Sequence, residues 1–554
     1  MRDQITSLLA QIVKDLYGLD IDVELKRPEE QFGDFSTNVT LKLAGQLDKS
    51  PRDIAEAIQA SLSGNQMFEE VTIAGPGFIN LKVNISVLLE LAFSEAGKTM
   101  EGKVAVVEYS DPNPFKSLHA GHLYTSIYGD AVANLIANSG ATVYRVNFGG
   151  DVGLHVAKSI WAIVKEFGGV NPEKLNDIQE ADRSDWLSQR YIEGNTAFTE
   201  SESAKEEIKK FNQQIYEISQ TLDKESPLAQ IYWTCRTWSY QYFEQFYARL
   251  NIKFDKYYPE SEVAELGLKT VREHIPDVYE ESQGAIVFNG EKHGLYTNVF
   301  INSEGVPTYA AKDVGLILTK WQDYHYDKSV IITDNGQAEY MKVVLTSVNQ
   351  FEPDLIKSTT HITHGVVKLP GGKKMSSRSG NILKATDILD LAEQATKDKE
   401  LKYDPRITIG AVKYSFLKQR VGADIVFDAE ESVSIEGNSG PYLQYAYTRA
   451  FSILSKAESN LDLKTVDNFT DDERQLLRKI GEFSETVELA TSELMPHHTS
   501  TYLYELAQEF NRFYEKNRVI DDERQDVRLS LIKLYSLKLS EGLGLLGMER
   551  LEKM

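Results

Sequence analysis

A segment with two histidines, His119-Ala-Gly-His122, has residue types and spacing suited to phosphate chemistry. It follows an apolar stretch and precedes a predicted helix, whose N-terminus would offer unpaired N–H groups and a partial positive charge to a phosphate. Gly121 would let a flat ring approach the backbone closely. The two imidazoles could donate hydrogen bonds to phosphoryl oxygens as negative charge develops on them. Because a match somewhere in a chain of this composition has a chance probability of about 1%, two ordinary surface histidines remain the alternative.

A second segment, Lys374-Met375-Ser376-Ser377-Arg378, lies in a stretch with glycines on both sides. From 366 to 384 the chain has five basic residues and no acidic one, whereas its overall net charge is −23. Lysine and arginine in such a loop could supply positive charge for a pyrophosphate leaving group. A solvated basic loop without a function is the alternative interpretation.

The composition is that of a folded chain with several domains. Its 554 residues, of which 42% are hydrophobic and 26% charged, fit about two to four globular domains. No stretch reaches the roughly eighteen apolar residues of a membrane-spanning helix, and Met1-Arg2-Asp3-Gln4 begins no secretory segment. The single cysteine, Cys235, excludes an internal disulfide framework and a zinc site built from several thiolates. These features predict a cytoplasmic location and no membrane contact.

The acidic charge balance limits the classes of partner. A general polyanion binder would present a basic domain, whereas this chain has 83 acidic and 60 basic residues. Nucleic acid is still possible as a ligand, because a local basic groove can work inside an acidic protein.

Residues 1–98 are predicted to form a small α/β domain. Its first helix carries an apolar stripe at helical spacing, made of Ile5, Leu8, Leu9, Ile12, Val13 and Leu16. Pro51 suits the first turn of another helix. Two strands over 71–73 and 78–83 are predicted to pair around the turn between them.

The next part of the chain alternates strands and helices, which implies a parallel sheet with right-handed crossovers. The first unit consists of a strand over 104–109, a helix over 123–138 and a strand over 142–146. The pattern returns in a strand over 329–333, a helix to about 350 and a strand over 361–367. Residues 160 to about 280 are predicted to be a helical excursion, and helices are predicted again from about 405 to the end.

Together, the two segments that could bind phosphates resemble the HIGH and KMSKS elements of class I aminoacyl-tRNA synthetases. Within that class the chain resembles arginyl-tRNA synthetases over essentially its whole length. The resemblance is carried by the segments over 108–122, 32–38, 75–80, 307–313, 440–449, 501–507 and 542–547. The N-terminal segments are the most discriminating, because other class I synthetases lack that domain.

The resemblance implies an α/β fold with three domains. These are a small α/β N-terminal domain that contacts the tRNA elbow, a Rossmann-type parallel-sheet catalytic domain with a helical insertion, and an all-α anticodon-binding domain. The expected limits are 1–98, 99–400 with the insertion at about 160–280, and 401–554. The chain would be a divergent, bacterial-type member and a monomer.

The resemblance also implies a reaction. ATP and L-arginine form arginyl-adenylate and pyrophosphate, and the terminal adenosine 2′-OH of tRNA(Arg) then attacks the acyl carbon and releases AMP. Mg²⁺ would accompany ATP, whose phosphates need charge neutralisation, and no structural metal is expected. By resemblance, the catalytic residues are His119, His122, Lys116 and Lys374. The residues expected to bind ATP are Gly121, Met375, Ser376, Ser377 and Arg378.

The substrate side chain sets a further requirement. A guanidinium is a planar fork that favours carboxylates in bidentate geometry, and lysine cannot imitate it. By resemblance, Glu108 and Asp313 would bind this group and Tyr309 would pack against the arginine side chain. The α-amino and carboxylate end, or the ribose, would be held by Asn113, Gln337 and Asp151. From the residues alone, the two acids could equally be ordinary strand-end and helix-start acids, Tyr309 a core aromatic and Asp151 a turn residue.

Tyrosines are frequent in the C-terminal helices, and aromatic faces stack on unpaired bases. Helical packing explains such residues equally well. By resemblance, the residues expected to contact tRNA are Phe32, Asn38, Arg420, Tyr442, Arg449 and Met554. For the arginines, solvated charges on helices are the alternative to phosphate contacts.

The sequence departs from the family's pattern at several positions. The departures are Tyr124 for the usual arginine, Val152 and His155 in the usual Gly-Asp-Trp-Gly-x-Gln, Tyr340 for the usual histidine, and Ser377 and Arg378 in KMSKS. Lys116 would take over from the missing second lysine of KMSKS. The departures affect the expected contacts around Asp151 and Gln337 more than the reaction itself.

Two other functions remain open from the sequence. A class I synthetase for glutamate or glutamine would share the catalytic scaffold, but Glu108 and Asp313 would repel an acidic side chain. A non-catalytic tRNA-binding relative is the other candidate, against which the intact His119-Ala-Gly-His122 segment argues.

Overall fold

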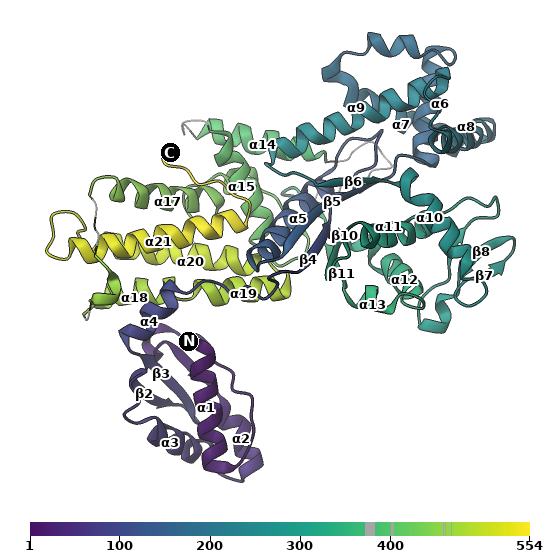
Figure 1. Ribbon diagram of the computed structural model, residues 1–554. Coiled ribbons are helices and arrows are strands. Elements are labelled where there is room, and N and C mark those ends of the chain that lie inside the picture. Colours follow the sequence, from purple (N-terminus) through teal and green to yellow (C-terminus); the bar gives the residue numbers. More distant parts are fainter. Residues whose placement is uncertain (372–382, 400–403, 458, 460, 467) are drawn as a thin grey trace.

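The structure is a computed structural model that describes residues 1–371, 383–399, 404–457, 459, 461–466 and 468–554. Figure 1 shows an N-terminal lobe at one end, a helical bundle beside it, a central sheet, and a group of helices at the far end. None of the helices in these ranges is long and apolar enough to cross a membrane.

The N-terminal lobe is a three-stranded antiparallel sheet, in the order β1-β3-β2, with helices packed on it. Its elements are α1 (Arg2–Tyr17), β1 (Phe35–Thr37), α2 (Val39–Leu47), α3 (Pro51–Leu62), β2 (Phe68–Ala74), β3 (Phe78–Val83) and α4 (Ile85–Phe93). The predicted pairing of β2 with β3 is confirmed. On α1, Ile5, Leu9 and Val13 of the apolar stripe are buried, whereas Leu16, in the last turn before the helix ends, is 41% exposed.

The central sheet has five parallel strands in the order β11-β10-β4-β5-β6. They are β4 (Val104–Glu108), β5 (Thr142–Gly149), β6 (Lys256–Pro259), β10 (Lys328–Asp334) and β11 (Thr359–His364). The predicted α/β class is therefore confirmed. The chain adds β5 and β6 on one side of β4 and later β10 and β11 on the other, so the strand order reverses between β4 and β10. Ligands of open α/β sheets bind beyond the carboxyl ends of the strands at such a point.

The helices between β5 and β6 form the insertion, which differs from the prediction at its end. They are α6 (Leu154–Phe167), α7 (Arg183–Glu200), α8 (Glu202–Thr221) and α9 (Pro227–Arg249), and they lie together in Figure 1. The helical excursion predicted to about 280 is interrupted by β6, which joins the central sheet beside β5. Its four residues are too few to show a hydrophobic period.

The segment from β6 to β11 covers one side of the sheet. Its helices are α10 (Glu260–Glu273), α11 (Tyr309–Tyr324), α12 (Ala338–Val348) and α13 (Pro353–Lys357), and its small antiparallel sheet consists of β7 (Glu280–Ser282), β8 (Ala285–Phe288) and β9 (Asn298–Ile301). α10 and α11 are packed closely: a Cβ atom at Gly267 would lie 1.8 Å from the carbonyl oxygen of Ala311. This contact holds the middle of α10 against the start of α11.

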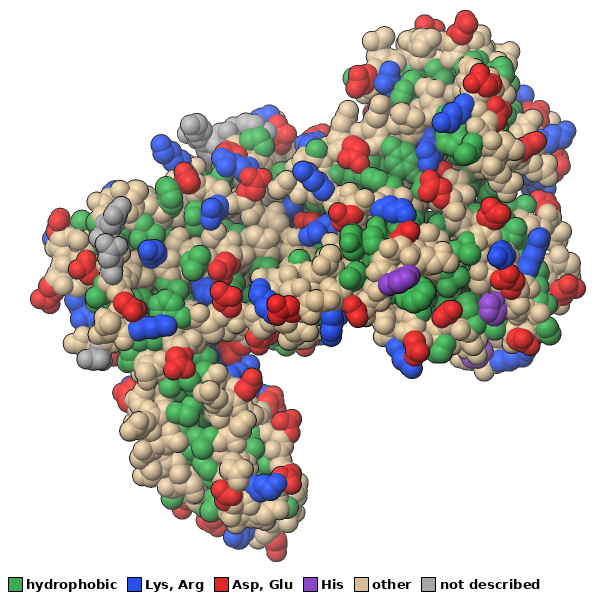
Figure 2. All heavy atoms as spheres, in the orientation of Figure 1, with side chains coloured by type: hydrophobic (Ala, Val, Ile, Leu, Met, Phe, Trp, Pro, Cys, Tyr) green, Lys and Arg blue, Asp and Glu red, His purple; other side chains and the backbone are tan. Residues whose placement is uncertain are grey.

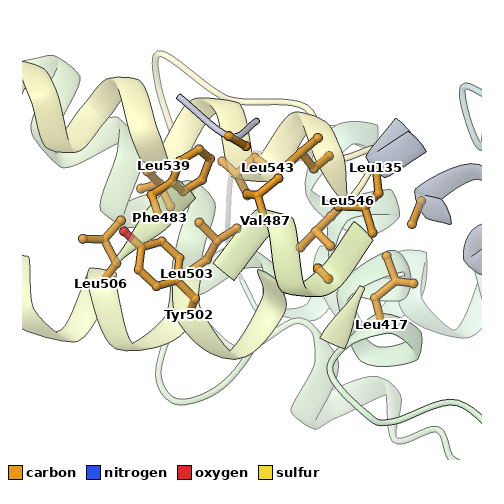
Figure 3. Close-up of a cluster of buried hydrophobic side chains, with 14 of the residues drawn as sticks. Leu135, Leu417, Phe483, Val487, Tyr502, Leu503, Leu506, Leu539, Leu543 and Leu546 are labelled. Atoms are coloured by element: carbon orange, nitrogen blue, oxygen red, sulfur yellow. The ribbon is translucent and has the colours of Figure 1, made fainter. Parts of the chain in front are cut away.

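The C-terminal part is helical, as predicted, apart from a short pair formed by β12 (Val367–Lys368) and β13 (Ile425–Val426). Its helices are α14 (Ala385–Asp398), α15 (Pro405–Leu417), α16 (Ala429–Ser432), α17 (Gly440–Leu454), α18 (Asp471–Ile480), α19 (Phe483–Glu493), α20 (His497–Lys516) and α21 (Gln525–Leu545). Figure 3 shows Val487, Leu503 and Leu543 of this bundle in one cluster with Leu135 from the helix that follows β4. The bundle and that helix therefore share a core.

The helix that follows β4 is α5 (Ala120–Asn138), which begins slightly before the predicted position 123. Most of its side chains are buried, because it lies between the central sheet and the C-terminal helices. A Cβ atom at Gly129 would lie 2.2 Å from the ring of Tyr109. The close approach of α5 to the end of β4 therefore requires glycine here.

We expect Gly129→Ala to lower the free energy of unfolding by about 1–3 kcal/mol, because the added methyl group overpacks the contact with Tyr109. Gly544→Ala is the matched control: its Cβ position in α21 is open, and an exposed helical alanine is favoured over glycine by up to about 1 kcal/mol. Urea unfolding of both variants measures the difference. A Gly129→Ala protein as stable as the unmodified chain would contradict this account of the packing.

Candidate active site

His119 and His122 cap the N-terminus of α5. Nδ1 of His119 accepts the backbone N–H of Gly121 at 3.1 Å, and Nδ1 of His122 accepts the backbone N–H of His119 at 3.1 Å. The two rings are stacked with their centroids 3.8 Å apart. Because each Nδ1 is an acceptor, the ring proton lies on Nε2, where it can be donated outward.

Both rings are neutral at pH 7. Desolvation by the surrounding protein lowers the pKa of His119 to about 4, although Asp334 acts in the opposite direction. Desolvation also lowers the pKa of His122 well below its usual value, and the neighbouring His119 and Lys116 add to the effect. The arrangement therefore offers two N–H donors at a helix N-terminus, a setting that stabilises developing negative charge.

The chain that follows residues 372–382 is fixed to the start of α5. Ala120 donates its backbone N–H to the carbonyl of Leu383 at 2.9 Å, and Ala385 donates to the carbonyl of Leu118 at 2.9 Å. The KMSKS-like residues predicted to bind ATP pyrophosphate lie outside the described residues; they are Lys374, Met375, Ser376, Ser377 and Arg378. Their predicted roles stay predictions.

Lys116 approaches the histidine pair from the loop after β4. Its Nζ lies 4.1 Å from the centroid of the Tyr191 ring on α7. Desolvation lowers the pKa of this lysine to about 8, with repulsion from Lys158 adding to the shift and Glu260 opposing it. A mostly protonated ammonium is thus held in a confined space near the two imidazoles.

Three buried carboxylates lie beyond the ends of the central strands. Glu108 ends β4, Glu260 directly follows β6, and Asp313 is in the second turn of α11. Burial raises the pKa of Asp313 to about 7, and repulsion from Glu108 and Glu260 adds to the rise. The three side chains are therefore close enough to interact electrostatically, and the role in arginine binding predicted for Glu108 and Asp313 stays a prediction.

The three carboxylates differ in their partners. Lys320 forms a buried ion pair with Glu108, and Lys312 forms one with Glu260 at 2.5 Å. Asp313 instead accepts a hydrogen bond from the hydroxyl of Tyr340, and within the described ranges it forms no ion pair with lysine or arginine. Asp313 is therefore the carboxylate in this group with charge left for a cationic ligand.

Glu260 was not among the residues predicted from the sequence. A Cβ atom at Gly150 would lie 2.4 Å from Asn113 Oδ1 and 2.9 Å from Glu260 Oε1, so both side chains converge on this glycine. The signal that could have identified Glu260 was its position directly after a strand of the parallel sheet. That strand, β6, was itself missed.

The loop after β4 holds Asn113 in a constrained backbone. Ser110, Asp111 and Phe115 have φ angles of 76°, 47° and 67°. Non-glycine residues in this region cost about 1–3 kcal/mol each and cluster at functional sites. Asn113 Oδ1 accepts the backbone N–H of Gly150 at 3.0 Å, which links this loop to the loop after β5.

Tyr309 and Gln337 lie on the exposed side of this region. Tyr309, the first residue of α11, has 55% of its surface exposed, so it is not a core aromatic. Its ring centroid is 5.3 Å from Nζ of Lys312, which is paired with Glu260. Gln337 is exposed in the turn after β10.

The structure does not support direct ligand binding by Asp151. Its carboxylate is fully buried and accepts hydrogen bonds from Nε of Arg236 at 2.8 Å, and from the backbone N–H and hydroxyl of Ser261 at 2.9 and 2.7 Å. These contacts join the loop after β5 to α9 and α10. Because its partners come from distant parts of the chain, the sequence could not reveal that this carboxylate is occupied.

The residues that depart from the family pattern lie close to the site. Tyr340 binds Asp313, and His155 lies with Nε2 2.5 Å from the carbonyl oxygen of Gly150. Tyr124 is fully buried in α5, with its ring centroid 4.5 Å from that of His364. Val152 is fully buried as well.

The residues predicted to contact tRNA are spread over the N-terminal lobe and the bundle. Phe32 is 43% exposed and lines a hollow of about 620 Å³ between the lobe and α18, and Asn38 is half-buried. Met554 lines another hollow, of about 1040 Å³, with Arg550. Lysine, arginine and acidic side chains are intermixed on the face seen in Figure 2.

Arg449 of α17 has the most defined surroundings of these residues. Its guanidinium carbon lies 5.0 Å from the ring centroid of Tyr445 and 5.9 Å from that of Tyr514. Asn511 accepts a hydrogen bond from Arg449 at 2.8 Å and donates one to the hydroxyl of Tyr442 at 2.9 Å. Arg420 is exposed after α15.

Family models match almost the whole chain. Residues 85–429 match tRNA synthetases class I (R), catalytic domain; residues 443–554 match the DALR anticodon binding domain; and residues 2–83 match the arginyl tRNA synthetase N terminal domain. The arginine–tRNA ligase of Crocosphaera subtropica is 31% identical to this chain, covering 99% of it and 98% of the relative. That of Bdellovibrio bacteriovorus is 29% identical, covering 95% and 93%.

A solved structure gives the same answer for the fold. The arginyl-tRNA synthetase of Thermus thermophilus superposes over 100% of both chains with a TM-score of 0.81 at 23% identity. The family matches extend along the chain in the same order as the N-terminal lobe, the central sheet and the helical bundle. The chain therefore belongs to the arginyl-tRNA synthetase family of the class I tRNA synthetases.

Proposed function

We propose that this protein is an arginine–tRNA ligase that uses ATP to form arginyl-adenylate and then transfers the arginyl group to tRNA(Arg). The family membership supports the reaction, because arginine–tRNA ligases match along the whole chain. The observation that carries the proposal is the group of buried carboxylates together with the histidine-capped start of α5, both of which interact electrostatically with Lys116. The carboxylates are suited to a cationic side chain, and the histidine-capped helix start is suited to a phosphoryl group.

In the first step the carboxylate oxygen of arginine attacks the α-phosphorus of ATP. A new O–P bond forms, the bond to the β-phosphate oxygen breaks, and pyrophosphate leaves with the bonding pair. Neutral His119 and His122 donate hydrogen bonds from their Nε2–H groups to the phosphoryl oxygens as negative charge develops there. We assign charge neutralisation to Lys116, to Lys374 and to Mg²⁺ carried by ATP.

Recognition of arginine is assigned to the acidic group. The carboxylate of Asp313 accepts two parallel hydrogen bonds from the planar guanidinium, a geometry that an ammonium group cannot match. Glu260 and Glu108 lie beside it and add negative potential, although each is paired with a lysine. Tyr309 covers the aliphatic part of the side chain. Asn113 and Gln337 hold the α-amino and carboxylate end.

In the second step the 2′-OH of the terminal adenosine attacks the acyl carbon. The bond from that carbon to the phosphate oxygen breaks, and AMP leaves with the bonding pair while the hydroxyl proton passes to its phosphate. We assign tRNA contacts to Phe32 and Asn38 in the N-terminal lobe, and in the bundle to Arg420, Tyr442, Arg449 and Met554. The guanidinium of Arg449 between two tyrosine rings is a preformed surface for stacking or phosphate contact. We further propose that the enzyme is a cytoplasmic monomer with domains over 1–98, 99–400 and 401–554.

A ligase for glutamate or glutamine does not fit the buried charge. An acidic side chain placed beside Asp313, Glu108 and Glu260 would add a further negative charge in a desolvated site. A non-catalytic relative would have no need of two neutral imidazoles held with their Nε2 atoms free to donate.

The purified protein is expected to charge total tRNA with arginine in the presence of ATP and Mg²⁺, and not to attach lysine or glutamate to it. Filter-binding assays with each radiolabelled amino acid measure the three rates side by side. Arginine-dependent ATP–pyrophosphate exchange is expected only when tRNA is added, as is frequent in the family. Charging with glutamate, or with none of the three, would refute the proposed function.

We expect His122→Ala to lower the rate of adenylate formation by at least about tenfold, because a hydrogen bond to charge that develops in the transition state is lost. His122→Asn is the matched control for the helix cap, since its amide oxygen can still accept the N–H of His119 but cannot replace the Nε2–H donor. The measurement is tRNA-dependent ATP–pyrophosphate exchange. Full activity in a folded His122→Asn protein would remove the donor role.

Arginine binding is expected to depend on pH through Asp313. Its pKa of about 7 in the free protein means that below pH 7 the carboxyl must lose a proton to bind the cation. The affinity should therefore fall by about tenfold per pH unit below 7 and stay level above it. Desolvation lowers the pKa values of both His119 and His122, that of His119 to about 4, which favours their neutral forms.

Isothermal titration calorimetry with arginine from pH 5.5 to 8.5 tests this expectation, with proton release read from two buffers of different ionisation enthalpy. Asp313→Asn is the control, and it should bind arginine weakly at every pH. An affinity for arginine that does not change between pH 5.5 and 7 in the unmodified protein would contradict the assignment.

A further inference from the structure

One face of α7 contacts the segments on both sides of the phosphate site. Asp185 Oδ1 pairs with Nζ of Lys384 at 2.6 Å. One turn later, the hydroxyl groups of Ser188 and Ser117 share a hydrogen bond of 2.5 Å. After one more turn, the ring of Tyr191 lies 4.1 Å from Nζ of Lys116. Residues spaced by three along a helix share a face, so the last two contacts place α7 directly along 116–117.

α7 has little freedom to move from this position. A Cβ atom at Gly194 would lie 2.0 Å from the carbonyl oxygen of Lys158, so α7 and α6 touch backbone to backbone one turn beyond Tyr191. Nζ of Lys158 also donates to Asn195 Oδ1 at 2.9 Å, and Arg190 pairs with Glu166 of α6. Because α6 follows directly from the loop after β5, the ring of Tyr191 is held in register with the central sheet.

The surroundings of Lys116 do not favour a positive charge. Desolvation and Lys158 lower the pKa of its ammonium to about 8, against the opposing effect of Glu260. Conversely, Lys116 lowers the pKa of His119, His122 and His155, which shows that these groups face it as well. A carboxylate beside Lys116 would restore the charge but would compete with a phosphate for it. The negative face of an aromatic ring attracts the ammonium without neutralising it.

We propose that Tyr191 is a positioning residue, whose ring face holds the ammonium of Lys116 where it meets the phosphates of ATP. The helical insertion thereby contributes to adenylate formation without touching substrate. The inference rests on the proposed role of Lys116 in neutralising phosphate charge. It assigns the contribution to the ring and not to the hydroxyl group.

The experiment compares Tyr191→Phe and Tyr191→Leu, each with Lys116 intact and with Lys116→Met, in tRNA-dependent ATP–pyrophosphate exchange. Phenylalanine keeps the aromatic face, and leucine fills similar space without it. We expect Tyr191→Phe to stay within about twofold of the unmodified enzyme and Tyr191→Leu to lose about five- to thirtyfold in kcat, as for a shielded cation–π contact. The KM for arginine should not change. In the Lys116→Met background, Tyr191→Leu should cause no further loss.

The outcomes separate this inference from the function on which it rests. Equal losses in the two Tyr191 variants, an unimpaired Tyr191→Leu enzyme, or an added loss in the Lys116→Met background would each overturn the positioning role. Full exchange activity in Lys116→Met would instead refute the role of Lys116, and the inference with it. No arginine-dependent exchange by the unmodified protein would refute the proposed ligase. Thermal melting identifies a Tyr191→Leu protein that is unfolded, in which case the Tyr191→Phe and Tyr191→Met pair gives the same comparison.

Discussion

The site is built around Asp313, a buried carboxylate that forms no ion pair with any lysine or arginine in the described part of the chain. Glu108 and Glu260 each have a lysine partner, whereas in the described part of the chain Asp313 is bound by the neutral hydroxyl of Tyr340. Burying such a charge is costly, and here it raises the pKa of Asp313 to about 7. The fold tolerates this cost because β4, β6 and α11 are each fixed by extensive packing elsewhere. In the proposed function, a guanidinium that enters the site would relieve this repulsion, so the same constraint would give both selectivity and affinity.

The proposed phosphate site is at the start of α5, and the position of α5 depends on the helical bundle. Tyr128 of α5 donates its hydroxyl proton to the carbonyl of Leu494 at 2.6 Å, and Leu135 lies in the bundle core of Figure 3. Asp130 of α5 pairs with two basic residues: its Oδ1 lies 3.4 Å from Nε of Arg145 in β5, and its Oδ2 lies 3.9 Å from Nζ of Lys413 in α15. Lys413 also donates a hydrogen bond to the carbonyl of Gly547 at 2.7 Å. The helix that carries His119 and His122 is therefore wedged between the sheet and the part of the chain matched by the anticodon-binding family model.

What the sequence could predict was local. Hydrophobic periodicity and glycine or proline residues within short segments predicted the strand–helix–strand unit, the hairpin of the N-terminal lobe and the C-terminal helices. The structure confirms all three. The strand β6 was missed because its four residues follow a long run of helices, and Glu260 was missed with it. Likewise, the carboxylate of Asp151 is occupied by Arg236 and Ser261, and no window of sequence contains such distant partners. Leu16 shows a related limit, because the periodicity of an apolar stripe does not show at which residue its contacts with the core end.

The departure at Tyr340 is consistent with the charge of the site. The family pattern has histidine here, and an imidazole beside a carboxylate gains a proton readily and would then act as a counter-ion. A tyrosine hydroxyl instead donates a hydrogen bond and carries no positive charge, and burial next to Asp313 raises its pKa well above the usual value. Tyr340 therefore orients the carboxylate and stabilises its ionised form without replacing the cation that we propose the site binds. By this argument the divergent residue keeps Asp313 available for a guanidinium, which a protonated histidine would partly displace.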